Sequence, residues 1–89
     1  MPRVLFTAHL QKHVSGEPLD VNGATVAEAL DAVFVQRPTL RSYLLDDQGR
    51  VRQHVMIFVD NQLLHDRDKL SDAVRAAGEI YVMQALSGG

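Results

Sequence analysis

The sequence predicts an α+β domain in which one main helix packs against a small mixed β-sheet. Three observations carry this prediction: a β-rich N-terminal segment (3–10) that turns back on itself, one amphipathic segment (25–38), and two later β-rich segments (51–64 and 80–86). A hairpin, a crossing helix and a return to the same sheet form an α+β arrangement. The 89 residues, 46% of them hydrophobic, suffice for one modest core, so we expect a single domain over 1–89.

The N-terminal segment has the composition of a β-hairpin. The stretch "RVLFTAHL" is rich in β-forming residues from Val4 to Thr7, and the polar stretch "QKHVSGEP" follows it. The residues "PLDVNG" then supply a short return strand, which we expect Asn22 and Gly23 to end.

The segment "TVAEALDAVFVQRP" carries the strongest helix signal in the chain. Thr25 and Glu28 have the spacing of a capping box. One face of the predicted helix collects the apolar residues Val26, Leu30, Val33 and Phe34. Arg37 and Pro38 end it, because the residue before a proline avoids the α conformation.

The next segment, "TLRSYLL", predicts one or two further helical turns with Leu40, Tyr43 and Leu44 on one side. The following "DDQG" predicts a loop. The segment "VRQHVMIFVDNQLL" predicts two strands around a tight turn at Asp60 and Asn61.

The last part of the chain predicts a short helix and a final strand. We expect the helix within "LSDAVRAAGE", capped by Ser71, and the strand at "IYVMQAL". The charged stretch "DRDK" just before them is interpreted as a surface loop.

Alternation along the later strands predicts two different faces of the sheet. If one set points toward the helix, it consists of Val55, Ile57, Val59, Ile80 and Val82. The opposite set is then Met56, Phe58, Tyr81 and Met83. Two interpretations stay open here: the second set forms, with Leu5, an apolar patch available to a partner, or loops cover it or the facing is reversed.

Composition removes several classes of function. The formal net charge of -2 leaves no basic excess to neutralise phosphates, so we expect no nucleic acid and no anionic membrane as partner. The absence of cysteine excludes disulfides, thiolate metal sites and cysteine nucleophiles. The apolar run near the N-terminus is too short for a signal peptide or a membrane span, so we expect a soluble, cytoplasmic protein.

Polar side chains show no pattern of a catalytic or metal centre. The histidines are interpreted as surface residues, since none belongs to a ligand cluster: His9, His13, His54 and His65. Asp46 and Asp47 are interpreted as a solvated turn rather than a cation site. No serine has a histidine at a recognisable offset, and no glycine-rich phosphate loop is present.

The chain ends in two glycines, Gly88 and Gly89. A tail without side chains is thin enough to enter a narrow channel, and its terminal carboxylate is unhindered. A free carboxylate becomes an acyl donor only after activation. The alternative is a frayed terminus without function.

Taken together, these segments resemble the MoaD/ThiS-type ubiquitin-like sulfur carriers, the family of the small subunit of molybdopterin synthase and the thiamine-pathway sulfur carrier. The resemblance covers nearly the whole chain through "VLFTAHLQKHVSG", "TVAEALDAVFVQRP", "LLDDQGRVRQHVMIFVDNQLL" and "GEIYVMQALSGG". The long "LRSYLLDDQGRVRQHV" segment is most similar to the molybdopterin-synthase subunit and the carrier used for cysteine synthesis.

The resemblance implies a β-grasp fold with a flexible tail over about 86–89 and a mechanism centred on Gly89. A ubiquitin-activating-type enzyme would use ATP and magnesium to adenylate the Gly89 carboxylate, and a sulfur donor would displace AMP to leave a thiocarboxylate. A sulfur-accepting synthase would then receive the sulfur. The chain would be a co-substrate rather than an enzyme, with no bound cofactor or metal.

The same resemblance assigns the site residues. Gly89 is the site of adenylation and Gly88 gives the tail its flexibility. The residues expected to bind partners are Leu5, Met56, Phe58, Tyr81, Met83, Leu86 and Ser87. Two alternatives remain: a protein modifier joined through Gly89 to a lysine of a target, and a binding module that is never activated and uses only its apolar face.

Overall fold

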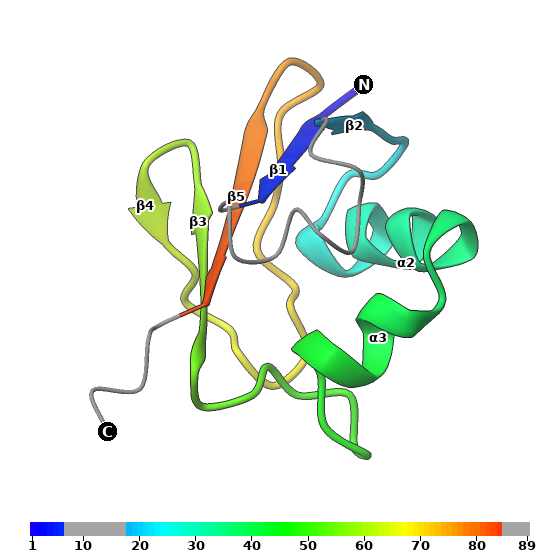
Figure 1. Ribbon diagram of the computed structural model, residues 1–89. Helices are drawn as coiled ribbons and strands as arrows, with labels where there is room; N and C mark the ends of the chain where they lie inside the picture. Colours follow the sequence, from blue (N-terminus) through cyan, green and yellow to red (C-terminus); the bar gives the residue numbers. More distant parts are fainter. Residues whose placement is uncertain (7–17, 85–89) are drawn as a thin grey trace.

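The computed structural model describes residues 1–6 and 18–84 (Figure 1). Five strands form one sheet in the order β2-β1-β5-β3-β4. The strands are β1 (Arg3–Phe6), β2 (Leu19–Asp20), β3 (Val55–Val59), β4 (Gln62–Leu63) and β5 (Glu79–Gln84), and the helices are α2 (Val26–Gln36) and α3 (Thr39–Leu44). Residues 7–10, which the sequence assigns to the first strand, lie outside the described residues.

The sheet is mixed, as predicted, and β5 is its central strand. β1 runs parallel to β5, whereas β3 runs antiparallel to it. The pairing of β1 with β5 runs from Arg3 opposite Glu79 to Phe6 opposite Val82. The last residue of β5, Gln84, pairs with Val55, the first residue of β3. The end of β5 therefore lies between the end of β1 and the beginning of β3.

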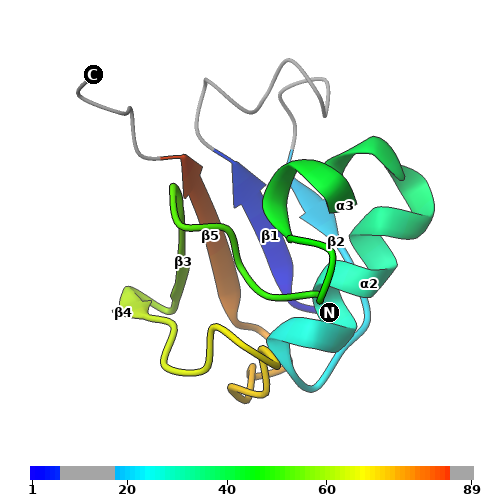
Figure 2. The same ribbon diagram turned by 90° about the horizontal axis from the view of Figure 1, so that it is seen from below.

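Both helices cover the same side of the sheet (Figure 2). α2 begins at Thr25, whose Oγ1 accepts a hydrogen bond from the Glu28 N–H at 3.2 Å. The Glu28 carboxylate accepts from the Ala24 N–H at 2.9 Å, one residue before the cap, and so completes the predicted capping pair. The helix ends at Arg37, just before Pro38. In the described part of the chain no helix has the length and apolarity needed to cross a membrane.

The hydrophobic core lies between the sheet and the helices. It contains the predicted helix face, Val26, Leu30, Val33 and Phe34, and also Leu40 and Leu44 of α3. The sheet contributes Val4, Phe6, Val55, Ile57, Ile80 and Val82. Val59 is partly buried and packs against this cluster. The facing in which Val55, Ile57, Val59, Ile80 and Val82 point to the helix is therefore confirmed.

The tight turn between β3 and β4 is also confirmed. Asp60 and Asn61 both have positive φ, 48° and 70°, as a type I′ turn requires. The Asp60 carboxylate accepts a hydrogen bond from the Glu79 N–H at 3.0 Å, which attaches the turn to the start of β5.

The prediction of a short helix capped by Ser71 is wrong. The segment that precedes β5 pairs its main chain with the beginning of α2: the Val26 N–H donates to the Asp72 carbonyl at 3.0 Å, and the Val74 N–H donates to the Ala24 carbonyl at 2.9 Å. These bonds engage main-chain groups that a helix would need. The Ser71 hydroxyl instead donates to the Asp66 carboxylate at 2.5 Å.

Candidate functional site

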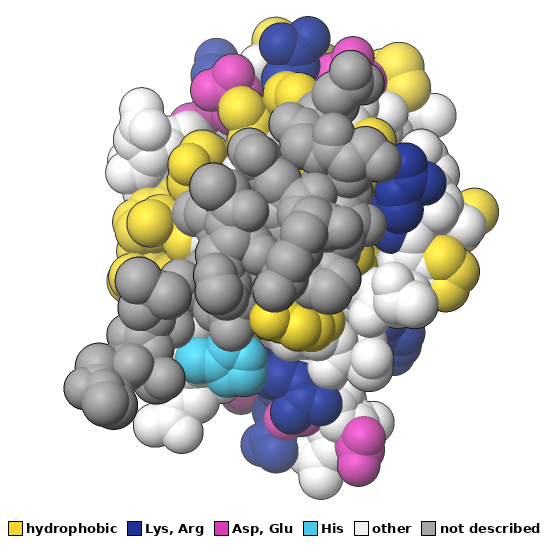
Figure 3. Space-filling model, in the orientation of Figure 1, with side chains coloured by type: hydrophobic (Ala, Val, Ile, Leu, Met, Phe, Trp, Pro, Cys, Tyr) yellow, Lys and Arg dark blue, Asp and Glu magenta, His cyan; other side chains and the backbone are white. Residues whose placement is uncertain are grey.

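The side of the sheet opposite the helices carries a row of apolar side chains, which we name the open face: Leu5, Met56, Phe58, Tyr81 and Met83. Register brings them together, because Tyr81 of β5 lies between Leu5 of β1 and Phe58 of β3. Tyr81 is 39% exposed, and the other members are half-buried. The structure excludes the reversed facing, because the opposite set lies in the core, and the use of this face by a partner stays a prediction. Figure 3 shows hydrophobic side chains at the surface over the region of β3 and β4.

Part of the open face is hollowed. Leu5, Phe58, Tyr81 and Met83 line a shallow depression of about 350 Å³, together with Asn61 and Glu79 at one end. The depression therefore has apolar walls and one carboxylate at its border. Concave, mostly apolar surfaces with few polar groups are typical of binding sites.

The turn between β3 and β4 lies at the end of the open face where Glu79 is found, and a charged pair holds it. Arg75 Nε lies 3.1 Å from Asp60 Oδ2. The hydrogen bond from Arg75, followed by the one from the Glu79 N–H, lowers the pKa of the Asp60 carboxyl below its ordinary value of 3.8. Asp60 is thus ionised and positions the backbone from which the Glu79 side chain projects.

The C-terminal tail begins at the opposite end of the open face. Gln84, paired with Val55, is the last described residue of β5. The predicted site residues Leu86, Ser87, Gly88 and Gly89 lie outside the described residues. The structure therefore brings together the five open-face residues and fixes where the tail starts.

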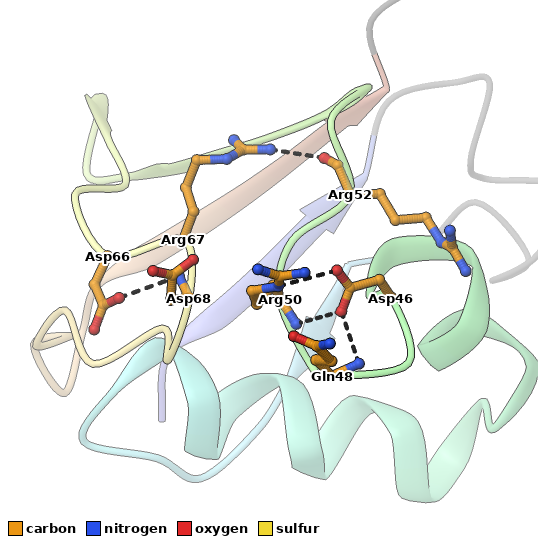
Figure 4. A network of polar contacts seen from close by, with 7 residues as sticks. All are labelled: Asp46, Gln48, Arg50, Arg52, Asp66, Arg67 and Asp68. Atoms are coloured by element: carbon orange, nitrogen blue, oxygen red, sulfur yellow. Dashed lines mark hydrogen bonds and ion pairs between the residues drawn. The ribbon is translucent and has the colours of Figure 1, made fainter.

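A polar network supports the segment that enters β3 (Figure 4). One terminal nitrogen of Arg67, Nη2, donates to the Arg52 carbonyl at 2.7 Å and to the Val55 carbonyl at 2.8 Å. The Val51 N–H donates in turn to the Arg67 carbonyl at 2.9 Å. The interpretation of "DRDK" as a plain surface loop missed this role, and no spacing in the sequence indicates it.

Asp46 and Asp66 organise the two loops of this network. Asp46 accepts hydrogen bonds from the N–H groups of Gln48 and Arg50, as expected of a turn aspartate. Asp66 accepts from the N–H groups of Asp68 and Lys69 and from Ser71. Main-chain N–H donors hold the pKa of Asp46 below its ordinary range, and for Asp66 the Ser71 hydroxyl is the main cause of the same lowering.

These aspartates are occupied by local hydrogen bonds. Among residues 1–6 and 18–84, no group of three or more histidine or acidic side chains is placed to hold a metal ion. His65 is an exposed residue whose Nδ1 lies 4.0 Å from Asp72 Oδ2, while His9 and His13 lie outside the described residues.

Comparison with known proteins identifies the family. The model of the ThiS family matches residues 4–89. Small archaeal modifier protein 1 of Haloferax volcanii is 32% identical over 72 residues, which are 80% of this chain and 78% of the relative. A crystal structure of that protein has a TM-score of 0.80 and 27% identity, with 99% of this chain and 98% of the other covered.

The fold is shared more widely. A chain from the crystal structure of the Amycolatopsis orientalis BexX/CysO complex has a TM-score of 0.87 at 21% identity, with both chains covered completely. The crystal structure of Mycobacterium tuberculosis CysO has a TM-score of 0.84 at 17% identity, covering 97% of this chain and all of the other. The family match over almost the whole chain, together with this shared architecture, shows that the chain belongs to the ThiS family of ubiquitin-like, β-grasp sulfur carriers.

Proposed function

We propose that this chain carries sulfur on its C-terminal residue, as a thiocarboxylate of Gly89. The observation that carries the proposal is the family match, which extends to residue 89 and so includes the Gly88-Gly89 terminus. The position of β5 supports it, because the tail starts from the central strand, next to the open face.

Activation has two steps. The Gly89 carboxylate attacks the α-phosphate of ATP on a ubiquitin-activating-type enzyme, with magnesium, and pyrophosphate leaves. A sulfide-equivalent donor then attacks the acyl carbon and AMP leaves, so that a carbon–sulfur bond replaces the carbon–oxygen bond to the nucleotide. The main-chain terminus carries the sulfur, which suits a sequence without cysteine.

The open face supplies the binding energy for the enzymes that act on the tail. Half-buried Met56, Phe58 and Met83 present adaptable apolar surface, and Tyr81 adds a flat ring. Leu86 and Ser87 connect this docking surface to Gly88 and Gly89 inside the partner's channel. The chain acts as a co-substrate of the activating enzyme and of the synthase that accepts the sulfur.

The test is ATP–pyrophosphate exchange by the activating-type enzyme of the same organism in the presence of the full chain. We expect deletion of Gly89 to abolish exchange and to leave the denaturation midpoint unchanged, because chain termini contribute little to a core. Val35→Ala on α2 is the control, since this side chain is 81% exposed on the helical side, and it should support normal exchange. Unchanged exchange without Gly89 would contradict the proposal.

A second candidate function is conjugation to other proteins through Gly89. The name of the Haloferax volcanii relative, small archaeal modifier protein 1, favours considering it. Conjugation predicts a ladder of larger species on a blot against the tagged chain in its own organism. The ladder should disappear when Gly89 is deleted, whereas a carrier alone produces no ladder.

A further inference from the structure

One end of the open face lies near the start of the tail, and an acidic residue, Glu79, lies at the other end. Glu79, Tyr81 and Met83 alternate with the buried residues Ile80 and Val82, so all three project from the same side of β5. Met83 lies beside Met56 near the start of the tail. Glu79 lies at the far end of the strand and borders the depression.

The Glu79 carboxylate has no cationic partner among the described residues, although two arginines lie near it. Arg3 is opposite Glu79 in the β1–β5 register, but its Nε pairs with Asp20 at 3.1 Å. Arg75 pairs with Asp60 at the same distance. Both local guanidinium groups are thus engaged with other carboxylates, and Glu79 is left as an exposed negative charge at the border of an apolar depression.

We propose that this depression takes a lysine or arginine side chain of the enzyme that binds the open face. The inference rests on the proposed function for the identity of that enzyme. The alkyl stem of the basic side chain packs between Phe58 and Tyr81, and its charged end pairs with Glu79. The Tyr81 ring adds a cation–π contact. A neutral apolar side chain would fill the depression but leave Glu79 unpaired at the rim.

The acidic end sets the orientation of the complex. Charge complementarity fixes register more than it adds affinity, since a methionine-rich surface alone accepts several packings. Glu79 and Gln84 are five residues apart on one strand, which corresponds to about 17 Å. The basic residue of the partner therefore lies about 17 Å from the end of β5, where the chain leaves the sheet toward the tail.

The first test needs no partner enzyme. The full chain, labelled with ¹⁵N, is titrated with n-butylguanidinium and with its neutral isostere n-butylurea. We expect butylguanidinium to shift the amides around Glu79, Tyr81 and Phe58, and Glu79→Gln to weaken its binding about threefold. Asp31→Asn on the exposed side of α2 removes the same charge and should change nothing. Butylurea should bind all three proteins alike, and equal binding of butylguanidinium to all three would overturn the inference.

The second test uses the activating enzyme. Glu79→Gln should raise the KM for the carrier in pyrophosphate exchange about threefold and leave kcat unchanged, whereas Asp31→Asn should alter neither. A wild-type chain that is not activated contradicts the proposed function. Activation that is normal in wild type and insensitive to Glu79→Gln contradicts only the inference about the basic side chain.

Discussion

Gly23 shows how one residue can be required for a reason that local sequence does not reveal. The Asn22-Gly23 pair suggests a simple strand stop, yet a Cβ at Gly23 would lie 2.6 Å from the main-chain nitrogen of Ala29 and 3.0 Å from its Cα. These are backbone atoms of α2 and cannot rotate away. The loop therefore approaches the helix more closely than any side chain allows.

We expect Gly23→Ala to lower the free energy of unfolding by about 1–3 kcal/mol, the usual cost of overpacking. Urea denaturation measures the change. The exposed neighbour Asn22 provides the control, and Asn22→Ala should stay within about 0.5 kcal/mol of wild type. Equal stabilities of the two variants would show that the loop can move away from α2.

Asp60 links stability to pH through its hydrogen bonds. Its pKa is lowered from 3.8 in the folded state, mainly by Arg75 and then by the Glu79 N–H. A lowered folded-state pKa gives stability that is present above pH 3.8 and is lost as pH falls through the folded-state value. The unfolding free energy of Asp60→Asn should therefore fall less steeply below about pH 4 than that of wild type. Parallel curves of urea midpoint against pH would contradict this expectation.

Among the secondary-structure elements, those that are stabilised by interactions between residues close in sequence were predicted correctly. The helix over 26–36 has its own cap, its own apolar face and a proline just after it, and the structure agrees with all three. The segment from Ser71 to Gly78 carries a similar capping signal but forms no helix, because its main chain pairs with the start of α2. Such pairing joins residues far apart in sequence, so no local sequence pattern predicts it.

The Arg67 side chain is a second long-range feature of this kind. Its two hydrogen bonds hold the carbonyls of Arg52 and Val55, and Val55 pairs with Gln84, the last residue of β5. Hydrogen bonds to charged groups contribute about 1.5–3 kcal/mol. We expect Arg67→Ala to lower stability by that amount and to accelerate amide exchange at Val55 and Gln84.

Arg3→Ala is the matched control for Arg67. It removes a guanidinium whose ion pair with Asp20 is half exposed, and such pairs contribute about 0–1 kcal/mol. Exchange at the Val55–Gln84 end should stay as in wild type. Equal effects of the two substitutions on exchange would contradict a special role for Arg67.

At the scale of the whole molecule, strand alternation predicted the members of the open face but not their exposure. Their exposure depended on which side of the sheet the helices cover. α2 and α3 both pack on the opposite side, which leaves the open face at the surface. The sequence also left Glu79 without a role. Its proposed role depends on its place beside Tyr81 at the depression and on the pairing of the nearby arginines with other carboxylates. The tail residues Leu86 to Gly89 were assigned through family resemblance, and they remain predictions.

Phe58→Asp tests the open face as a docking surface. Phe58 is half-buried and stands outside the core cluster, so we expect the variant to fold. A charge inside an apolar interface should weaken binding to the activating enzyme by about 2 kcal/mol, roughly thirtyfold. Val35→Asp places the same charge on the helical side, at a residue that is 81% exposed, and should bind normally. Normal binding of a folded Phe58→Asp protein would exclude the open face as the docking surface.

Sulfur carriage by Gly89 can be measured as the intact mass of the protein purified from its own organism. A thiocarboxylate replaces one terminal oxygen by sulfur. Methionine oxidation changes the mass almost equally, so fragmentation must place the change beyond Met83, within "QALSGG". We expect the sulfur on Gly89. A plain carboxylate on Gly89, in cells that contain the activating enzyme and an ample sulfur donor, would contradict it.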